Sequence, residues 1–179
     1  MRKALYLLGI LDDVDIEWFA SNGAVEIVKA GSTLIYEKKP IDFLYLLLDG
    51  ELSVTVGGTT GQQIAKLYAG EIVGEISFVD ARPPSAAVTA IRDSKLLALP
   101  RDLVMAKLAK DQGFAARFYR AVARFLADRL FVTVGRFGYG SAQQDSDPDE
   151  LPESAMDDLD LAAVRIDKLI RRLHISNAA

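Results

Sequence analysis

Two glycines four residues apart, Gly70 and Gly74, enclose the segment that most constrains the fold of this chain. Glycine adopts positive φ angles without steric cost, so both positions suit close turns. An apolar helix beginning after Gly74 would aim unpaired backbone N–H groups at an anion, as helix N-termini do. Small residues follow over 85–90, and Glu75 would lie at the mouth of the site, ready to accept hydrogen bonds from hydroxyl groups. The segment therefore predicts a phosphate pocket.

This segment resembles the phosphate-binding cassette of the cyclic nucleotide-binding domain superfamily, which includes the cyclic AMP receptor protein and the regulatory subunit of protein kinase A. In that family the cassette reads roughly G-E-L-A-L, a short spacer, and then P-R-A/S-A-T/x-V. The resemblance implies that Glu75 accepts a hydrogen bond from a ribose 2′-hydroxyl group. It also implies that the N–H groups of Ser85 and Ala86 meet the cyclic phosphate. The matching backbone around Glu75 is formed by Gly74, Ile76 and Ser77.

One position departs from the family pattern, because Pro84 stands where the family carries an arginine that clamps the phosphate. Proline supplies neither a cation nor an N–H group. The missing charge-assisted hydrogen bond is worth about 2–3 kcal/mol, or roughly 30- to 150-fold in affinity. Arg82 is the alternative cation, although Pro83 favours an extended residue before it and so turns this side chain outward. We therefore expect weak, altered or absent binding of a cyclic nucleotide (cyclic AMP, since Ala87 lacks a hydroxyl group that could select guanine) or of another small phosphate ligand.

Around the cassette, the order of elements extends the resemblance to about residues 10–137. Apolar residues alternate at period two, or run continuously, between Gly, Asp, Pro and Ser turns, which is typical of short strands. We expect strands at 24–35 with a break at Gly31, 43–48, 51–56, 64–67, 86–92 and 95–99. The implied fold is mainly β with flanking helices (α+β). It consists of a cyclic nucleotide-binding-type β-roll (a double-stranded β-helix or jelly roll) followed by a long C-terminal helix.

The same pattern divides the chain into consecutive parts. These are an N-terminal helical segment (1–23), the β-roll with a short helix (24–110), a long dimerisation helix (111–137), an acidic linker (138–155) and an amphipathic tail helix (156–175). Asp12 and Asp13 are interpreted as helix-start residues, because acidic side chains favour the first turn of a helix.

The long helix carries apolar residues spaced by three and four, which keeps one stripe on one face for about five turns. In the family, the last helix pairs with its copy in a dimer and covers the nucleotide, so the resemblance implies a homodimer. The stripe would then place four residues against the partner copy: Phe118, Val122, Phe125 and Leu126. The alternative is that the stripe packs on the β-roll of its own chain.

The tail helix is amphipathic, with acidic residues in its first turns and basic residues in its last, which matches the helix dipole. Its apolar stripe consists of Leu159, Ile166, Leu169, Ile170 and Leu173. Two alternatives stay open. The helix folds back onto its own β-roll or onto the partner copy, or it docks in a groove on another protein. His174, the only histidine, is interpreted as a surface cap near the C-terminal carbonyl groups of this helix.

Composition limits the cellular compartment and the kinds of chemistry that we expect for the protein. The 179 residues include no cysteine, which excludes disulfides, thiol catalysis and cysteine zinc sites and favours the cytoplasm. No segment reaches the ~18 apolar residues that a membrane-spanning helix needs. The basic and apolar N-terminus lacks a small-residue cleavage site, so we expect a packed helix there instead of a signal peptide.

Neither DNA binding nor catalysis is expected. Transcription factors of the family carry a winged helix-turn-helix after the long helix, and it is longer than the 39 residues that follow Gly140 here. The acidic linker would repel phosphate backbones, and no G-x-S-x-G elbow or Walker lysine loop is present. We expect a non-catalytic regulatory or sensor domain that requires no cofactor or metal. An interaction module without a ligand is the alternative, and a true cyclic AMP-binding regulator is the third interpretation.

Overall fold

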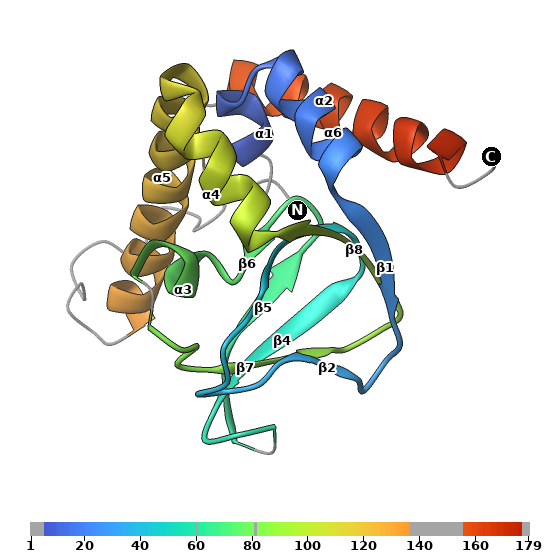
Figure 1. Cartoon of the computed structure of the whole chain (residues 1–179). Coiled ribbons are helices and arrows are strands. Elements are labelled where there is room, and N and C mark those ends of the chain that lie inside the picture. Colours follow the sequence, from blue (N-terminus) through green and yellow to red (C-terminus); the bar gives the residue numbers. More distant parts are fainter. Residues whose placement is uncertain (1–5, 60, 81, 137–155, 177–179) are drawn as a thin grey trace.

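Two four-stranded sheets lie beneath a layer of helices in the computed structural model, which describes residues 6–59, 61–80, 82–136 and 156–176 (Figure 1). The strands of the first sheet, in order, are β1 (Ala24–Val28), β8 (Ser94–Pro100), β3 (Phe43–Asp49) and β6 (Ile72–Val73). Those of the second are β2 (Thr33–Ile35), β7 (Ala87–Ala90), β4 (Glu51–Val56) and β5 (Gln62–Tyr68). Neighbouring strands pair antiparallel in both sheets, and the predicted β-roll is confirmed.

The described helices precede, interrupt and follow the strands. They are α1 (Tyr6–Ile10), α2 (Asp13–Asn22), α3 (Glu75–Asp80), α4 (Arg101–Lys110), α5 (Gln112–Arg136) and α6 (Met156–Ser176). Helix α2 begins as predicted, because the Asp12 carboxylate accepts a hydrogen bond from the backbone N–H of Asp15 at 3.0 Å. The Asp15 carboxylate accepts one from the N–H of Asp12 at the same distance, which completes a capping box.

Strand β3 separates two hydrophobic cores, which explains its continuous apolar run. Alternate side chains of a strand point to opposite sides of the sheet. Leu44, Leu46 and Leu48 join the cluster beneath the helices, whereas Tyr45 and Leu47 join the cluster between the two sheets. The inner cluster forms one wall of the candidate site described below.

The first half of α5 packs against its own chain. Phe118 is 0% exposed and Val122 is 2% exposed, because aromatic side chains of α2, α3 and α5 surround this part of the helix. The prediction that these two residues face a partner copy is therefore wrong, since they complete the core under the helices. Phe125 and Leu126 are partly buried. Among the side chains that the structure describes beyond this point, the large apolar ones that α5 exposes are Leu130, Phe131 and Val134.

Helix α6 lies on α1 and α2 (Figure 1). Leu169 and Leu173 are buried in the cluster that contains Leu8 and Leu11, with Ile166 and Ile170 partly buried beside them. The Arg165 guanidinium donates hydrogen bonds to the Asp13 carboxylate at 2.9 Å and to the Leu8 carbonyl at 2.8 Å. The side chains of Leu159 and His174 and the acidic linker lie outside the described residues.

Candidate ligand-binding site

A cavity of about 70 Å³ opens between the second sheet, α3 and α5. Its lining includes every cassette residue that the sequence predicted: Gly74, Glu75, Ile76, Ser77, Ser85 and Ala86. Apolar side chains from β2, β4, β5, β6 and β7 close the inner wall, and Pro84 and Arg129 complete the boundary. The structure thus brings together two ends of the cassette that are ten residues apart in the sequence.

Gly74 is required by the path of the backbone into α3. Its φ is +92°, and a Cβ atom there would lie 2.7 Å from Ile41 Cδ1 and 3.5 Å from the Phe43 carbonyl oxygen. The positive φ would strain any other residue, whereas the end of the Ile41 side chain could shift to admit a Cβ atom. The turn lets α3 begin at Glu75, and the backbone N–H of Phe78 donates to the Gly74 carbonyl at 3.1 Å. This geometry places the first residues of α3 on the cavity.

Glu75 is buried and paired with an arginine of α5. Its Oε1 atom accepts a hydrogen bond from Arg129 Nη1 at 2.6 Å, and Nη2 of the same guanidinium lies 3.5 Å from Glu71 Oε2. The guanidinium also lies 4.3 Å from the ring centroid of Phe125. Burial raises the pKa of both Glu71 and Glu75, although the positive charge of Arg129 acts in the opposite direction. Arg129 therefore covers the carboxylate that the resemblance assigns to ribose.

Sequence reasoning missed Arg129 as a site residue. The available signal was its place on the stripe of the long helix, where a charged residue interrupts apolar ones. A charged side chain on the packed face of a helix needs a buried partner, because an unpaired buried charge is costly. The pattern could have indicated that an acidic partner was needed, but not that Glu75 would be this partner.

Arg101, at the start of α4, holds the far end of α3. Its guanidinium donates to the carbonyl oxygens of Ser77 at 2.9 Å and Phe78 at 3.3 Å, and it lies 5.1 Å from the Phe78 ring centroid. The last carbonyl groups of a helix have no partner within the helix, so these bonds satisfy them. Arg101 is a positioning residue for the cassette that sequence reasoning did not identify.

Pro84 occupies the position at which the family carries the phosphate-clamping arginine, and its side chain offers only hydrocarbon there. Pro84 is buried and lines the cavity, whereas Arg82 is exposed and pairs with Asp80 on the surface. Arg82 is not part of the cavity lining, so its position gives no support to the alternative that it replaces the missing cation. The physical reason is the one expected from the two prolines, which direct the turn outward before it returns to Ser85.

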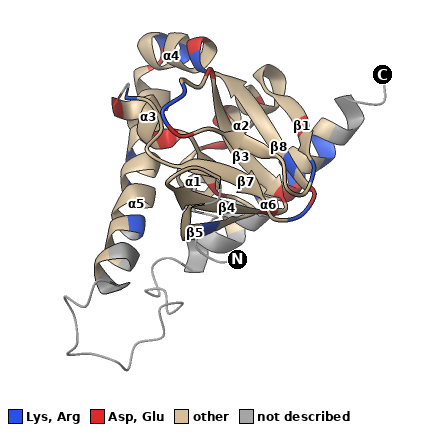
Figure 2. Ribbon diagram, turned by 90° about the horizontal axis from the view of Figure 1, so that it is seen from below, with Lys and Arg blue, Asp and Glu red and all other residues tan. Residues whose placement is uncertain are grey.

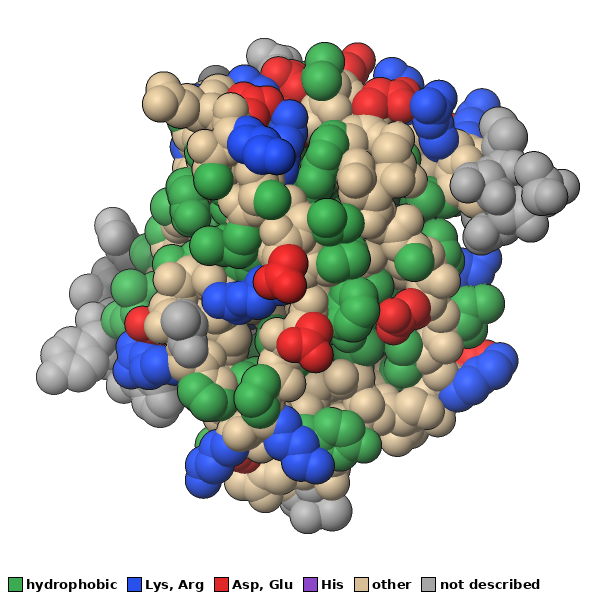
Figure 3. Space-filling view, viewed as in Figure 1, with side chains coloured by type: hydrophobic (Ala, Val, Ile, Leu, Met, Phe, Trp, Pro, Cys, Tyr) green, Lys and Arg blue, Asp and Glu red, His purple; other side chains and the backbone are tan. Residues whose placement is uncertain are grey.

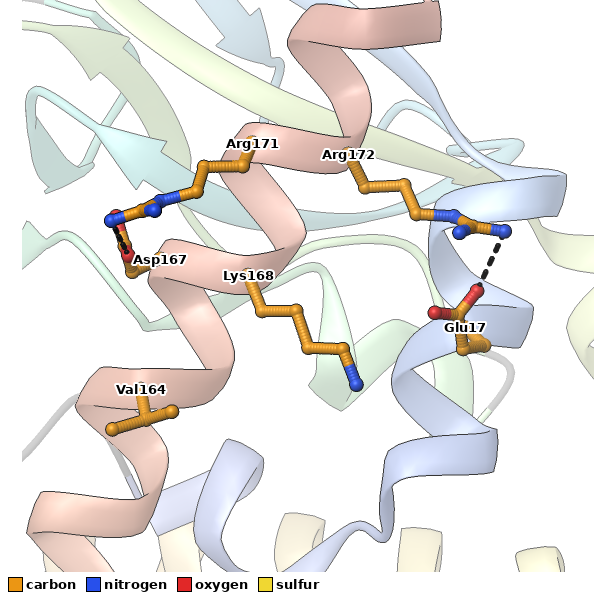
Figure 4. Close-up of a pocket in the computed structure, with 6 residues that line it drawn as sticks. All are labelled: Glu17, Val164, Asp167, Lys168, Arg171 and Arg172. Atoms are coloured by element: carbon orange, nitrogen blue, oxygen red, sulfur yellow. Dashed lines mark ion pairs between the residues drawn. The ribbon is translucent and has the colours of Figure 1, made fainter.

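A second concavity, of about 440 Å³, lies between α2 and α6 (Figure 4). Its charged side chains are paired on an open surface: Arg171 Nη2 lies 2.7 Å from Asp167 Oδ2, and Arg172 Nη2 lies 2.9 Å from Glu17 Oε2. Both pairs are well exposed, and Val164 contributes apolar surface beside them. Ligand sites usually combine concave apolar walls with a few buried polar groups. The smaller cavity at Glu75 has that character, so we assign the candidate site there.

Two further features concern the described residues only. No group of three or more His, Asp or Glu side chains within them could hold a metal ion. In the same part of the chain, no helix combines the length and hydropathy needed to cross a membrane. Acidic and basic residues are interspersed along the ribbon (Figure 2).

Residues 25–111 match the family model of the cyclic nucleotide-binding domain. The chain is 36% identical over 81 residues to the cAMP-dependent protein kinase regulatory subunit of Aspergillus niger, a match that covers 44% of this chain and 20% of that protein. It is 27% identical over 118 residues to the lysophospholipase nte1 of Aspergillus terreus, which covers 65% of this chain and 7% of the relative. The chain thus spans only a small part of these relatives.

The fold has a counterpart among solved structures. A cyclic nucleotide-binding domain from Methylobacillus flagellatus KT superposes with a TM-score of 0.68 and 24% identity, covering 80% of this chain and 85% of that one. The match of residues 25–111 and the shared β-roll agree with each other. Residues 25–111 of the chain are therefore similar in sequence to the cyclic nucleotide-binding domain, and the chain shares the fold of a solved domain of that kind.

Proposed function

We propose that this chain is a non-catalytic regulatory domain that senses a small phosphate-bearing ligand and binds cyclic AMP only weakly. One observation carries the proposal: buried Pro84 lines the cavity where the resemblance implies a phosphate-clamping arginine. Backbone N–H groups of Ser85 and Ala86 remain to meet an anion, but the bidentate charge-assisted pair is lost. The expected loss is about 2–3 kcal/mol of binding free energy.

The pair between Arg129 and Glu75 supports altered as well as weaker binding. A ribose hydroxyl group must share the Glu75 carboxylate with Arg129 Nη1, which already lies 2.6 Å away. The cavity of about 70 Å³ is also smaller than the usual ligand pocket of about 300–1,000 Å³. Binding of a whole nucleotide therefore requires α5 or the Arg129 side chain to move.

A protein-interaction module that has kept the fold without a ligand is the second candidate. It is favoured by the outer side of α6, where Leu161 and Val164 are exposed although the opposite side is buried. Apolar residues on one face of a helix suit docking into a groove of a protein partner. In either case we place the chain in the cytoplasm as a homodimer that binds neither DNA nor membranes.

Calorimetric titration with cyclic AMP tests the ligand proposal. We expect Pro84→Arg to strengthen binding at least about tenfold, because the guanidinium restores a charge-assisted pair with the phosphate. Arg82→Ala is the matched control and should leave the affinity unchanged, since this side chain points to Asp80. Submicromolar binding of cyclic AMP by the unsubstituted chain would contradict the proposal.

A further inference from the structure

We infer that Glu71 is a positioning residue for the ligand site: it receives the guanidinium of Arg129 when a hydroxyl group of the ligand occupies Glu75. This role of Glu71 rests on the function proposed above for the cavity as a ligand site. Binding of a nucleotide requires either α5 or the Arg129 side chain to move, and Glu71 makes the smaller movement sufficient. Glu71 does not line the cavity, so it acts on the ligand only through Arg129.

Arg129 contacts two largely buried carboxylates, but not equally. Nη1 lies 2.6 Å from Glu75 Oε1, which is a short charge-assisted hydrogen bond. Nη2 lies 3.5 Å from Glu71 Oε2, which is longer than the usual range of about 2.7–3.2 Å. A shift of about 0.7 Å, to the usual charge-assisted length of about 2.8 Å, would complete this second bond. The guanidinium thus has a second carboxylate within a small displacement of its present position.

The Glu71 carboxylate is already fixed where it can receive the guanidinium. Its Oε1 atom accepts a hydrogen bond from the backbone N–H of Tyr68 at 3.1 Å, and the N–H of Glu71 donates to the Tyr68 carbonyl at 3.1 Å. These two bonds hold the backbone and the side chain of Glu71 in the turn between β5 and β6. The side chain is 14% exposed, so water competes little for its oxygen atoms. The transfer of Arg129 therefore requires no ordering of a new side chain.

A second carboxylate matters because losing the first one is costly. The Arg129 side chain is 29% exposed and its guanidinium lies 4.3 Å from the ring centroid of Phe125, so water can replace Glu75 only in part. Taking one partner from a buried ion pair is strongly unfavourable, since it leaves a charge uncompensated. A ligand hydroxyl group that displaces Arg129 from Glu75 must overcome this cost. Glu71 lowers the cost, because the guanidinium keeps a carboxylate partner.

The charge of Glu71 could instead act by simple repulsion of the phosphate. The carboxylates of Glu71 and Glu75 and the guanidinium of Arg129 together carry one net negative charge when all three are ionised. If repulsion dominated, removing the charge of Glu71 would strengthen the binding of a phosphate ester. Transfer of Arg129 to Glu71 requires the opposite sign, so the two effects are separable by one substitution.

Nuclear magnetic resonance titration with cyclic AMP and with 2′-deoxy cyclic AMP tests this role. The deoxy nucleotide lacks the hydroxyl group that would occupy Glu75, so Arg129 need not move when it binds. Glu71→Gln keeps an acceptor oxygen for the Tyr68 N–H but removes the charge that receives Arg129. We expect this variant to lose about tenfold in affinity for cyclic AMP and to bind the deoxy nucleotide as the unsubstituted chain does. Glu17→Gln, the same change in an ion pair between α2 and α6, is the matched control and should alter neither affinity.

The other outcomes of this titration contradict the role of Glu71. An equal loss of affinity for both nucleotides would mean that Glu71 only supports the turn between β5 and β6. Unchanged or stronger binding of cyclic AMP by Glu71→Gln would mean that the carboxylate receives no charge during binding. When Arg129→Gln has already removed the guanidinium, Glu71→Gln should have no further effect, because the two residues act on one step.

Hydrogen exchange of the unsubstituted chain provides a measurement that needs no variant. If Glu71 receives Arg129, the amides of α5 should stay protected when cyclic AMP is bound, because the helix remains in place. Faster exchange along the second half of α5 would show that the helix leaves instead, and would overturn the role of Glu71 alone. Absence of binding to both nucleotides and to inorganic phosphate at millimolar concentration would overturn the proposed function as well.

Discussion

Asp15 and Glu75 are both buried carboxylates paired with an arginine of α5, yet their pKa values move in opposite directions. Burial pushes the pKa of Asp15 upward, but hydrogen bonds from Arg117, at 2.6 and 2.9 Å, and from the backbone of Asp12 together outweigh it. For Glu75, burial is the larger effect and raises the pKa. Arginine favours the ionised carboxylate in both pairs, but only at Asp15 does this effect exceed that of burial.

The pH dependence of stability follows from these directions. The folded-state pKa of Asp15 lies below its unfolded value of about 3.9, so its stabilisation is present above that pH and is lost as the pH falls through the folded pKa. Asp15→Asn should lower the free energy of unfolding near neutral pH by about 2–3 kcal/mol and flatten its decline below about pH 4. Urea unfolding at a series of pH values measures both effects.

Glu75→Gln is the control for this experiment, because the pKa of Glu75 is raised and not lowered, so its contribution to stability changes with pH in the opposite direction. Its raised pKa means that ionisation opposes folding, so Glu75 lets stability rise as the pH falls through the folded pKa toward the unfolded value. The glutamine variant should lose that rise but keep the decrease in the free energy of unfolding that Asp15 causes below about pH 4. An unchanged acid decline in Asp15→Asn would contradict the assignment.

At the scale of elements, α6 closes the core that α1 and α2 leave open. Leu169 and Leu173 are almost completely buried there, and Arg165 fastens the helix to the carbonyl groups of α1. Ending the chain after Gly140 should lower the melting temperature, with at most about 1.5–3 kcal/mol lost for each large buried side chain.

Single substitutions refine the test of α6. Leu169→Ala should reproduce part of the loss, whereas Leu161→Ala, on the exposed side, should melt as the unsubstituted chain does. Unchanged melting of the truncated chain would mean that α6 is not docked on α1 and α2 in solution. Loss of a protein partner on truncation would then favour the interaction module.

At the scale of the whole molecule, the apolar surface of α5 bears on assembly. On the face shown in Figure 3, hydrophobic side chains reach the surface on the side formed by α4 and α5. Phe131 is 81% exposed, and Leu130 and Val134 are exposed with it. Contiguous apolar residues on a helix suit burial against a second copy. We expect Phe131→Glu to give a folded monomer by light scattering.

Phe118→Glu is the contrasting variant for assembly. Because Phe118 is completely buried within the chain, a charge there should unfold the protein and not merely dissociate it. Circular dichroism distinguishes the two outcomes. If the unsubstituted chain is monomeric at high concentration, the homodimer proposal fails.

The sequence alone predicted the β-roll and the location of the candidate site, because the patterns that indicate both are local. Alternation and turn residues mark strands, and a helix start after Gly74 follows from backbone chemistry over a few residues. The amino-acid sequence also showed that Pro84 replaces the clamping arginine, and it predicted that the Arg82 side chain points outward. What a residue contacts within its own segment is set by its neighbours in the chain.

Only the tertiary structure decided which distant residues form ion pairs and which pack in the same core. Arg129 and Glu75 are 54 residues apart, Arg117 and Asp15 are 102 apart, and Arg165 and Asp13 are 152 apart. The same limit explains the error at Phe118, since a stripe of apolar residues shows that a helix face is buried but not against what. Periodicity records the side of an element that avoids water. The partner is selected by packing and charge pairing across the folded chain, which no local pattern contains.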